Sequence, residues 1–211
     1  MADDQDGDDR NRRVYLVGIG AGDPEHLTLG AVRALNRTDA VFIVDKGEMG
    51  AALHAARLEL CRRVIDPIHP YRVVEVALEG VRDRDAGPYD NAISSWRDAR
   101  ATAYEELIGA LSAGEVGAFL AWGDPSLYDG TLAILDDVRS RGRVEFAVEV
   151  VPGVSSIAAL AARHAIALNR AGESILVTTG RRLMRDGVPD GVDNIVVMLD
   201  AHDAWHAFDD D

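Results

Sequence analysis

The chain has 211 residues, of which 47% are hydrophobic and 27% charged, and its formal net charge is -14 at pH 7. This composition is typical of a folded enzyme, and the length suffices for one large domain or two small α/β units. The negative charge disfavours nucleic-acid binding, which requires clustered Lys and Arg. The single cysteine, Cys61, excludes an intrachain disulfide and a thiolate metal cluster, and no metal site is expected.

The N-terminal stretch MADDQDGDDRNRR is acidic and has no apolar core. Residues 1–12 are therefore predicted to form a disordered tail, and the stretch does not resemble a signal peptide. No apolar run approaches the roughly 20 residues that span a bilayer. These features predict a cytoplasmic protein with no membrane partner.

Apolar, β-rich runs recur along residues 13–168, each ending at a charge or a Gly/Pro turn. They are Val14–Ile19, Ala40–Val44, Val73–Ala77, Val116–Ala121 and Phe146–Val151. Helical patterns separate them, and the clearest is an apolar stripe at spacings of three and four. Its members are Trp96, Ala99, Ala103, Leu107, Ala110 and Leu111. This alternation predicts an N-terminal α/β domain with a mainly parallel sheet covered on both faces.

A shorter set of elements follows in residues 169–211, which are predicted to be a partial C-terminal α/β domain. Ser174–Thr178 and Asn194–Leu199 are strand-like, and the basic turn GRRLMRDG lies between them. Two strands do not make a stable domain alone.

The tripeptide Gly-Asp-Pro follows two of the predicted strands. At the first site Gly18, Gly20 and Gly22 resemble a dinucleotide-binding turn, but Asp23 replaces the final glycine and Pro24 lacks a backbone N–H. An NAD-linked oxidoreductase is thereby disfavoured, although it stays an alternative, and Asp23 could act simply as a helix cap.

The second and third turns also follow predicted strands. Gly123-Asp124-Pro125 lies where open parallel sheets bind their ligands. VVPGVSS, residues 150–156, ends the next strand and opens an Ala-rich helix, where Ser155 or Ser156 could serve as an N-cap or contact a ligand. We expect the three turns to converge on one pocket.

The stretches YLVGIGAGDPEHLTLGA, GDPSLYDG, VVPGVSS and VVML, in this order, resemble the tetrapyrrole methylases, which are two-domain class III methyltransferases. The stretches VFIVDKGEMGAALHAARLELCRRVI and VRDRDAGPYDNAISSWRDARATAYEELI are similar to the members that methylate C-1 of precorrin-5 with loss of acetate, giving precorrin-6A in cobalamin biosynthesis. The resemblance runs from about Val14 to Asp200. Family members usually continue with further strands after VVML, so it implies a truncated second domain, and it allows a homodimer.

The resemblance implies that S-adenosylmethionine, with S-adenosylhomocysteine as product, lies folded between two domains. Motif matching gives as cofactor-binding residues Pro24, Gly123, Asp124, Ser126, Leu127, Tyr128, Ser155, Ser156, Met198 and Leu199. The polycarboxylate tetrapyrrole that it implies as substrate requires a local basic surface. The expected substrate-binding residues are Arg82, Arg84, Tyr89 and Arg181, whereas Arg62 and Arg63 fit a solvated face.

Loss of an acetyl group requires water to attack a carbonyl carbon, which a general base assists. Asp45, Glu48, Asp83 and Asp124 are candidate bases, and Asp45 and Asp83 are the predicted catalytic residues. Two further alternatives stay open at this point. One is another precorrin or tetrapyrrole methylase, and the other is a non-catalytic module that binds a tetrapyrrole or the cofactor.

Overall fold

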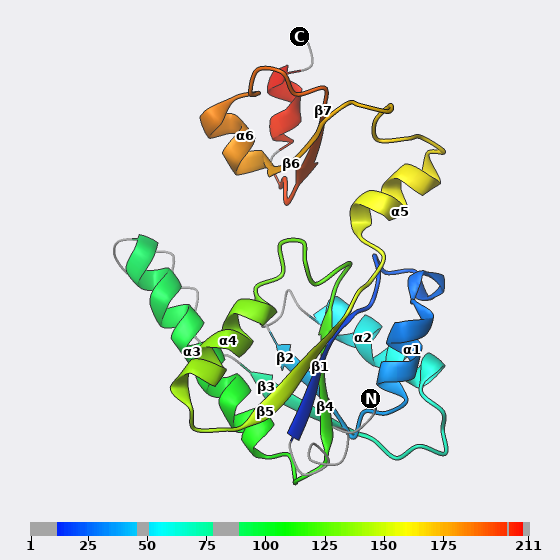
Figure 1. Cartoon of the computed structure of the whole chain (residues 1–211), viewed down its shortest axis with the longest axis vertical. Coiled ribbons are helices and arrows are strands. Elements are labelled where there is room, and N and C mark those ends of the chain that lie inside the picture. Colours follow the sequence, from blue (N-terminus) through cyan, green and yellow to red (C-terminus); the bar gives the residue numbers. More distant parts are fainter. Residues whose placement is uncertain (1–11, 46–50, 78–88, 202, 209–211) are drawn as a thin grey trace, which may run out of the picture. The chain divides into compact units, whose positions relative to one another are not determined.

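The computed structural model describes residues 12–45, 51–77, 89–201 and 203–208. Its contacts divide the chain into two units, Met1–Ser156 and Ile157–Asp211. The elements in chain order (Figure 1) are β1 Arg12–Gly18, η1 Pro24–His26, α1 Leu29–Leu35, β2 Ala40–Asp45, α2 Ala51–Val64, β3 Arg72–Ala77, α3 Tyr89–Gly109, β4 Val116–Ala121, α4 Thr131–Arg141, β5 Phe146–Val151, α5 Ser156–Arg163, β6 Ile175–Thr179, α6 Gly180–Asp186, β7 Asn194–Met198 and η3 Ala204–Phe208. The domain boundary drawn between residues 168 and 169 stays a prediction. The tail expected over residues 1–12 lies outside the described residues, except that Arg12 opens β1.

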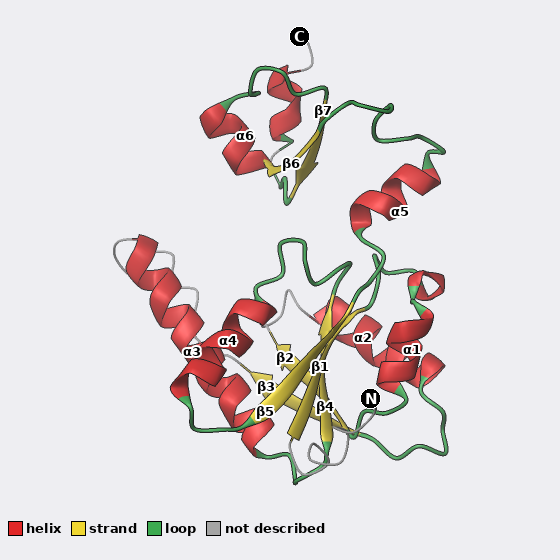
Figure 2. Cartoon of the chain, viewed as in Figure 1, coloured by secondary structure: helices red, strands yellow, loops and turns green. Residues whose placement is uncertain are grey.

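The first unit contains a five-stranded sheet in the order β3-β2-β4-β1-β5. Every neighbouring pair of strands is parallel. The predicted parallel α/β fold is therefore confirmed. The bounds of β4 and β5 are those expected, and the ends of β1, β2 and β3 lie within two residues of the expected ones. Parallel neighbours require crossover connections, and helices supply them on both faces of the sheet (Figure 2).

Each face of this sheet has its own apolar core, because successive side chains of a strand point to opposite faces. Tyr15 and Val17 of β1 pack with buried residues of α1 and α2. Val14 and Leu16 pack with buried residues of α3 and α4 on the other face. β1 is consequently buried continuously from Val14 to Gly18, as expected for a strand covered on both sides.

The apolar stripe expected on α3 is correct except at its C-terminal end. Tyr104 of α3 stacks on Phe119 of β4 with ring centroids 4.2 Å apart. The prediction was wrong at Ala110, which follows the last residue of α3, Gly109, and is exposed. Leu111 is buried nonetheless.

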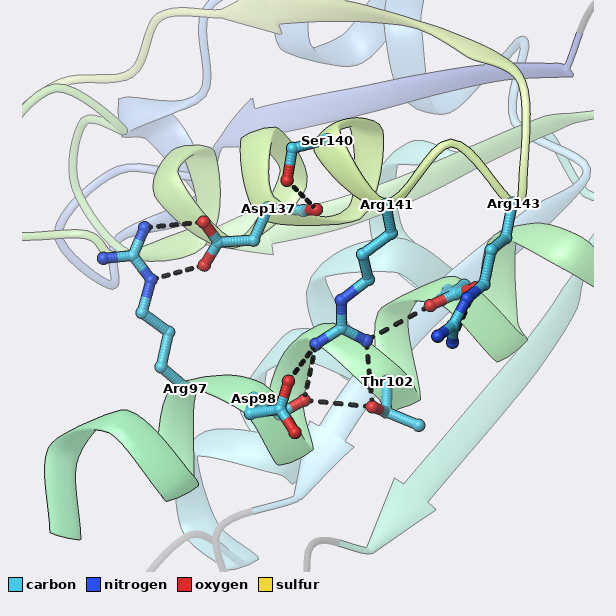
Figure 3. Close-up of polar contacts among 8 residues, drawn as sticks. Arg97, Asp98, Thr102, Asp137, Ser140, Arg141 and Arg143 are labelled. Atoms are coloured by element: carbon cyan, nitrogen blue, oxygen red, sulfur yellow. Dashed lines mark hydrogen bonds and ion pairs between the residues drawn. The ribbon is translucent and has the colours of Figure 1, made fainter. Parts of the chain in front are cut away.

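Ion pairs fasten α4 to α3 on the outer side of the sheet (Figure 3). Arg97 of α3 forms a two-point contact with Asp137 of α4, and Arg141 of α4 pairs with Asp98 of α3. Arg141 also lies 3.2 Å from Glu105. Single surface pairs stabilise little, but a network that joins two helices holds them in one register.

The second unit is much less buried. Its strands β6 and β7 pair in parallel from Ile175 and Asn194 to Thr179 and Met198, and α6 follows β6 directly. Thr179 caps α6, since its hydroxyl oxygen accepts a hydrogen bond from the Arg182 N–H. Among the described residues of this unit, those that are buried are Thr178, Gly180, Leu183 and Ala204. Nowhere in the described part of the chain is a helix both long and apolar enough to cross a membrane.

Candidate functional site

Three turns of the first unit meet at the carboxyl edge of its sheet. Parallel strands end at the same edge, and Gly18 at the end of β1 is in register with Ala121 of β4. On its other side β1 pairs with β5, where Val17 is in register with Val151. The first Gly-Asp-Pro turn, the second one and the Pro-Gly turn therefore leave the sheet from three adjacent strands.

The first two turns are joined by backbone hydrogen bonds beyond the ends of the strands. The Gly20 N–H donates to the Gly123 carbonyl at 3.3 Å, and the Gly123 N–H donates to the Gly20 carbonyl at 2.7 Å. This reciprocal pair forms an antiparallel bridge. Both residues have left-handed backbone angles, with φ of 77° and 70°, which glycine adopts without a steric penalty. The repeated glycines thus allow the two turns to face each other.

The third turn packs against the first two through backbone atoms. A Cβ atom placed on Gly153 would lie 2.1 Å from the Gly123 carbonyl oxygen, and one on Gly18 would lie 2.5 Å from the Gly153 nitrogen. Neither gap admits a methyl group. Sequence reasoning singled out the serines of VVPGVSS and missed this role of Gly153, although a glycine after a strand-ending proline is a signal for close backbone approach.

Asp124 ties the second turn to the third. Its Oδ2 accepts a hydrogen bond from the Gly153 N–H at 2.9 Å. Its Oδ1 accepts from the Ser126 N–H at 2.9 Å and also from the Ser126 hydroxyl. Burial by itself would raise the pKa of this carboxyl, but the hydrogen bonds from Ser126 and Gly153 outweigh it, and the pKa lies below its usual value. The carboxylate is therefore largely occupied in holding the turns together.

The first turn is anchored to the third as well. Pro24 opens η1, and Asp23 caps this helix, with its Oδ1 accepting from the Glu25 N–H at 2.9 Å. The expected capping role of Asp23 is confirmed. Thr28 then caps α1, and its hydroxyl donates to the Pro152 carbonyl at 3.3 Å.

The first turn suits a ligand without phosphate groups. Phosphate binding uses several backbone N–H groups and a positive potential. Here Pro24 has no N–H, and the Asp23 carboxylate takes the N–H of Glu25. No cluster of three or more His, Cys, Asp or Glu side chains suitable for a metal ion occurs within residues 12–45, 51–77, 89–201 and 203–208.

Two of the expected cofactor-binding residues have unusual backbone angles. Tyr128, after the second turn, has φ of 53° and is 48% exposed. Leu199, which follows β7 in the second unit, has φ of 52° and is 71% exposed. Left-handed angles are uncommon for such side chains and are concentrated at functional sites. No sequence signal indicated either angle.

The remaining expected residues are placed less completely. Asp45 is the last residue of β2, at the carboxyl edge, and Tyr89 is the first residue of α3, but the structure describes only their backbone. Glu48, Arg82, Asp83 and Arg84 lie outside the described residues. In the second unit Met198 ends β7, and Arg181 is exposed on α6. The structure thus brings together the turns that contain Pro24, Asp124 and Ser155, all in the first unit.

Comparison with known protein families gives a match over nearly the whole chain. Residues 13–208 match the model of the tetrapyrrole (corrin/porphyrin) methylases. The chain is 40% identical over 200 residues to the precorrin-6A synthase (deacetylating) of a Sinorhizobium species, covering 94% of this chain and 76% of that enzyme. It is 33% identical over 149 residues to a precorrin-2 C(20)-methyltransferase of the same genus, covering 69% of this chain and 55% of that enzyme.

Solved structures show the same fold. A cobalamin-synthesis-related protein, CobF, from Corynebacterium diphtheriae superposes with a TM-score of 0.76 and 32% identity, covering 93% of this chain and 76% of that one. A uroporphyrin-III C-methyltransferase from Thermus thermophilus superposes with a TM-score of 0.58 and 27% identity, covering 89% of this chain and 67% of that one.

Proposed function

The chain belongs to the tetrapyrrole (corrin/porphyrin) methylase family, and from this premise we propose that it methylates C-1 of precorrin-5, with S-adenosylmethionine as methyl donor, and releases acetate to give precorrin-6A. The observation that carries the proposal is the 40% identity to a precorrin-6A synthase over 94% of this chain. The match to the precorrin-2 C(20)-methyltransferase is lower and covers less of the chain, which favours the C-1 methylation among the reactions of the family.

The three turns at the carboxyl edge are the proposed cofactor-binding surface of the first unit. S-adenosylmethionine carries its methyl group on a positively charged sulfur, so methyl transfer needs little acid or base assistance. What the protein must supply is orientation in a position that excludes water. Backbone groups of Gly123 and of the Ser126–Tyr128 segment, held rigid by Asp124, are suited to that task because they cannot rotate away.

We assign the other predicted contacts by the same family match. In the first unit, Pro24, Ser155 and Ser156 would complete the cofactor surface. In the second unit, Met198 and Leu199 are the cofactor-binding residues that the family match assigns. For the polycarboxylate substrate, the proposed ligands are Arg82, Arg84, Tyr89 and Arg181, because a guanidinium binds a carboxylate through two parallel hydrogen bonds.

Release of acetate is the step that needs a base. A water molecule adds to the acetyl carbonyl carbon as a base accepts the water proton, and the bond from that carbon to the macrocycle breaks. Its electron pair goes to the macrocycle, which takes up a proton, and acetate is released. Asp45 and Asp83 are the proposed acceptors. Asp124 is the weaker candidate, because its carboxylate already accepts three hydrogen bonds. Of its roughly four lone-pair positions, about one is left.

The proposal is tested by incubating the protein with precorrin-5 and S-adenosylmethionine labelled in the methyl group, and by measuring label in the macrocycle together with free acetate. We expect both products in equal amounts, and calorimetric binding of S-adenosylhomocysteine without binding of NADH. Methylated macrocycle without acetate would reassign the chain to another methylation step of the family. NADH binding without S-adenosylhomocysteine binding would overturn the methyl-donor assignment.

A further inference from the structure

An open pocket of about 180 Å³ lies at the edge strand of the first unit, between α1 and β5. The reaction proposed above uses none of the side chains that line it. Pockets for drug-sized ligands measure about 300 to 1,000 Å³, so this one suits a smaller molecule. S-adenosylmethionine and tetrapyrroles belong to the larger class. The pocket is therefore a candidate for a second binding site, in addition to the three turns.

Tyr15 supplies the buried part of the pocket wall. It lies in β1, is 2% exposed and packs in the apolar core that faces α1 and α2. Its hydroxyl makes no hydrogen bond with a described residue, although a buried phenol normally has a partner. The hydroxyl oxygen is not sealed off from solvent, so it opens into the pocket. A ligand there would give this hydroxyl the partner that the described part of the chain does not supply.

Two arginines and one carboxylate also line the pocket. Arg33 lies in α1, Arg37 follows two residues after the end of that helix, and both are exposed. Glu149 of β5 is in register with Tyr15, so the two side chains point to the same face of the sheet. Within the described part of the chain, neither arginine forms an ion pair with Glu149 or with any other carboxylate. Other exposed arginines, such as Arg62, do.

These groups suit a small anion that also has a hydrogen-bond donor. Guanidinium groups and a phenol hydroxyl donate to the oxygens of a carboxylate or a phosphate. Glu149 can accept from a hydroxyl or ammonium group of the same molecule. The chain as a whole repels anions, since its net charge is -14, so an anion binds where local donors match its oxygens. Two positive side chains against one negative side chain make the pocket such a place.

The pocket adjoins two of the three turns. Pro152 lines it, and the next residue is Gly153, whose backbone packs against the first two turns. The Thr28 hydroxyl, at the start of α1, donates to the Pro152 carbonyl at 3.3 Å. The first turn leads into α1, and β5 leads into the third turn. A ligand that contacts both Arg33 and Glu149 would join α1 to β5 and thereby restrain the two turns.

We propose that this pocket binds a small organic anion with a carboxylate or phosphate group, held by Arg33, Arg37 and the Tyr15 hydroxyl, and that its binding strengthens cofactor binding at the turns. The second part rests on the proposed function for the identity of the cofactor, whereas the first part does not. By linkage, the cofactor must strengthen anion binding by the same factor. The pocket is then an effector site.

Titration calorimetry of the full chain with malate and with glycerol 3-phosphate tests the site. Malate has carboxylates, glycerol 3-phosphate has a phosphate, and both have a hydroxyl group for Glu149. We expect at least one of them to bind with a Kd of about 1 mM or lower, and more weakly as sodium chloride is added. Binding of malate alone would identify a carboxylate ligand, and binding of glycerol 3-phosphate alone a phosphate ester. If neither anion bound at about 10 mM, the site would be disproved.

Three variants show whether the anion lies in this pocket. Arg33→Gln, Arg37→Gln and Tyr15→Phe should each raise the Kd about threefold or more, and the double arginine variant about tenfold or more. Both arginines are exposed, and phenylalanine keeps the buried ring of Tyr15, so the fold should be retained. Urea denaturation of each variant checks this. A Kd that stayed at the wild-type value in all three variants would overturn the proposal.

Arg62→Gln is the matched control. It removes the same charge from an exposed arginine of the first unit, which pairs with Glu59 in α2 and does not line the pocket. We expect its Kd for the anion to stay within about twofold of wild type. An equal rise in Arg62→Gln and Arg33→Gln would mean that the anion responds to the overall charge of the chain, and the pocket would be excluded.

Calorimetry with S-adenosylhomocysteine, with and without saturating anion, tests the coupling. Its affinity should rise about threefold with the anion in the wild-type chain and should stay unchanged in the double arginine variant. An unchanged or lower affinity in the wild-type chain would overturn the effector role. A chain that bound the anion as expected but did not bind S-adenosylhomocysteine would refute the proposed function and support the pocket as a binding site.

Discussion

The two edges of the five-stranded sheet are held together by different means. At the amino edge, side chains bridge the strands: Arg72 at the start of β3 forms two hydrogen bonds with Glu115, at 2.7 and 2.8 Å. Asp39, before β2, accepts from the Val116 N–H at 2.8 Å. At the carboxyl edge, backbone packs directly on backbone, with glycines at Gly18, Gly123 and Gly153.

This difference separates stability from function. An ion pair at the amino edge leaves space around it, so its loss weakens the fold without altering a ligand surface. A backbone contact at the carboxyl edge leaves no room for an added side-chain atom. Its N–H and C=O groups are fixed where ligands of open parallel sheets bind. Substitutions at the carboxyl edge should therefore affect stability and ligand binding together, and those at the amino edge stability alone.

The largest effect is expected from Gly153→Ala. The new methyl group would lie 2.1 Å from the Gly123 carbonyl oxygen, which is backbone and cannot rotate aside. The turns would have to separate, at a cost of about 3 kcal/mol in the free energy of unfolding. Urea denaturation measures this cost, and calorimetry should show that S-adenosylhomocysteine binding is lost.

Gly109→Ala is the control for this substitution. Gly109 is the last residue of α3, and the nearest atom to an added Cβ would be Cγ2 of Val144 at 3.6 Å. Alanine there should leave stability unchanged or raise it by about 0.5 kcal/mol. If Gly153→Ala and Gly109→Ala unfolded at the same urea concentration, the close contact between the turns would be disproved.

Asp124→Asn should have the next largest effect. The substitution replaces a charged acceptor that serves the Gly153 N–H and two donors of Ser126. Hydrogen bonds to charged groups contribute about 1.5 to 3 kcal/mol when buried, and Asp124 is only partly buried, so we expect a loss of about 1.5 kcal/mol. Affinity for S-adenosylhomocysteine should fall as well, because the side-chain link between the two turns is weakened.

The effect of Asp124→Asn should depend on pH. The folded-state pKa of Asp124 is below its usual value, so its contribution to stability is fully present above the unfolded pKa, about 3.9. That contribution is lost as the pH falls through the folded pKa. The wild type and the variant should therefore converge in stability at low pH, and a gap that stayed constant down to pH 2 would contradict this account.

The elements of the fold could be predicted from the sequence because their signals are local. The apolar run of β4 and the Asp23 cap each depend on residues within a few positions, and both are present as expected. The prediction for Ala110 was wrong because a periodic pattern does not show where a helix ends.

The candidate site was predictable only in part. Its turns were found because parallel strands end at one edge, which topology alone dictates. The hydrogen bond that joins the second turn to the third was not predictable. It links Asp124 to Gly153, 29 positions away, and forms only when the chain has folded. The same holds for the left-handed angle of Tyr128, which no sequence pattern indicates.

Glu115→Gln at the amino edge should have the smallest effect, and this effect should also depend on pH. The hydrogen bond from Arg72, with a further one from the Ser112 N–H, lowers the pKa of Glu115 to about 2. Its contribution is thus present above the unfolded pKa, about 4.3, and is lost as the pH falls towards 2. Because both side chains are partly exposed, we expect a cost of about 1 kcal/mol at pH 7.

Thermal denaturation of the Gln variant between pH 2 and 7 measures this cost, and S-adenosylhomocysteine calorimetry at pH 7 provides the comparison between the edges. Ligand affinity should equal that of the wild-type chain, since Glu115 and Arg72 lie at the opposite edge of the sheet from the three turns. A loss of affinity as large as that of Asp124→Asn would show that the two edges are coupled through the strands, and the division between a stabilising and a functional edge would then be wrong.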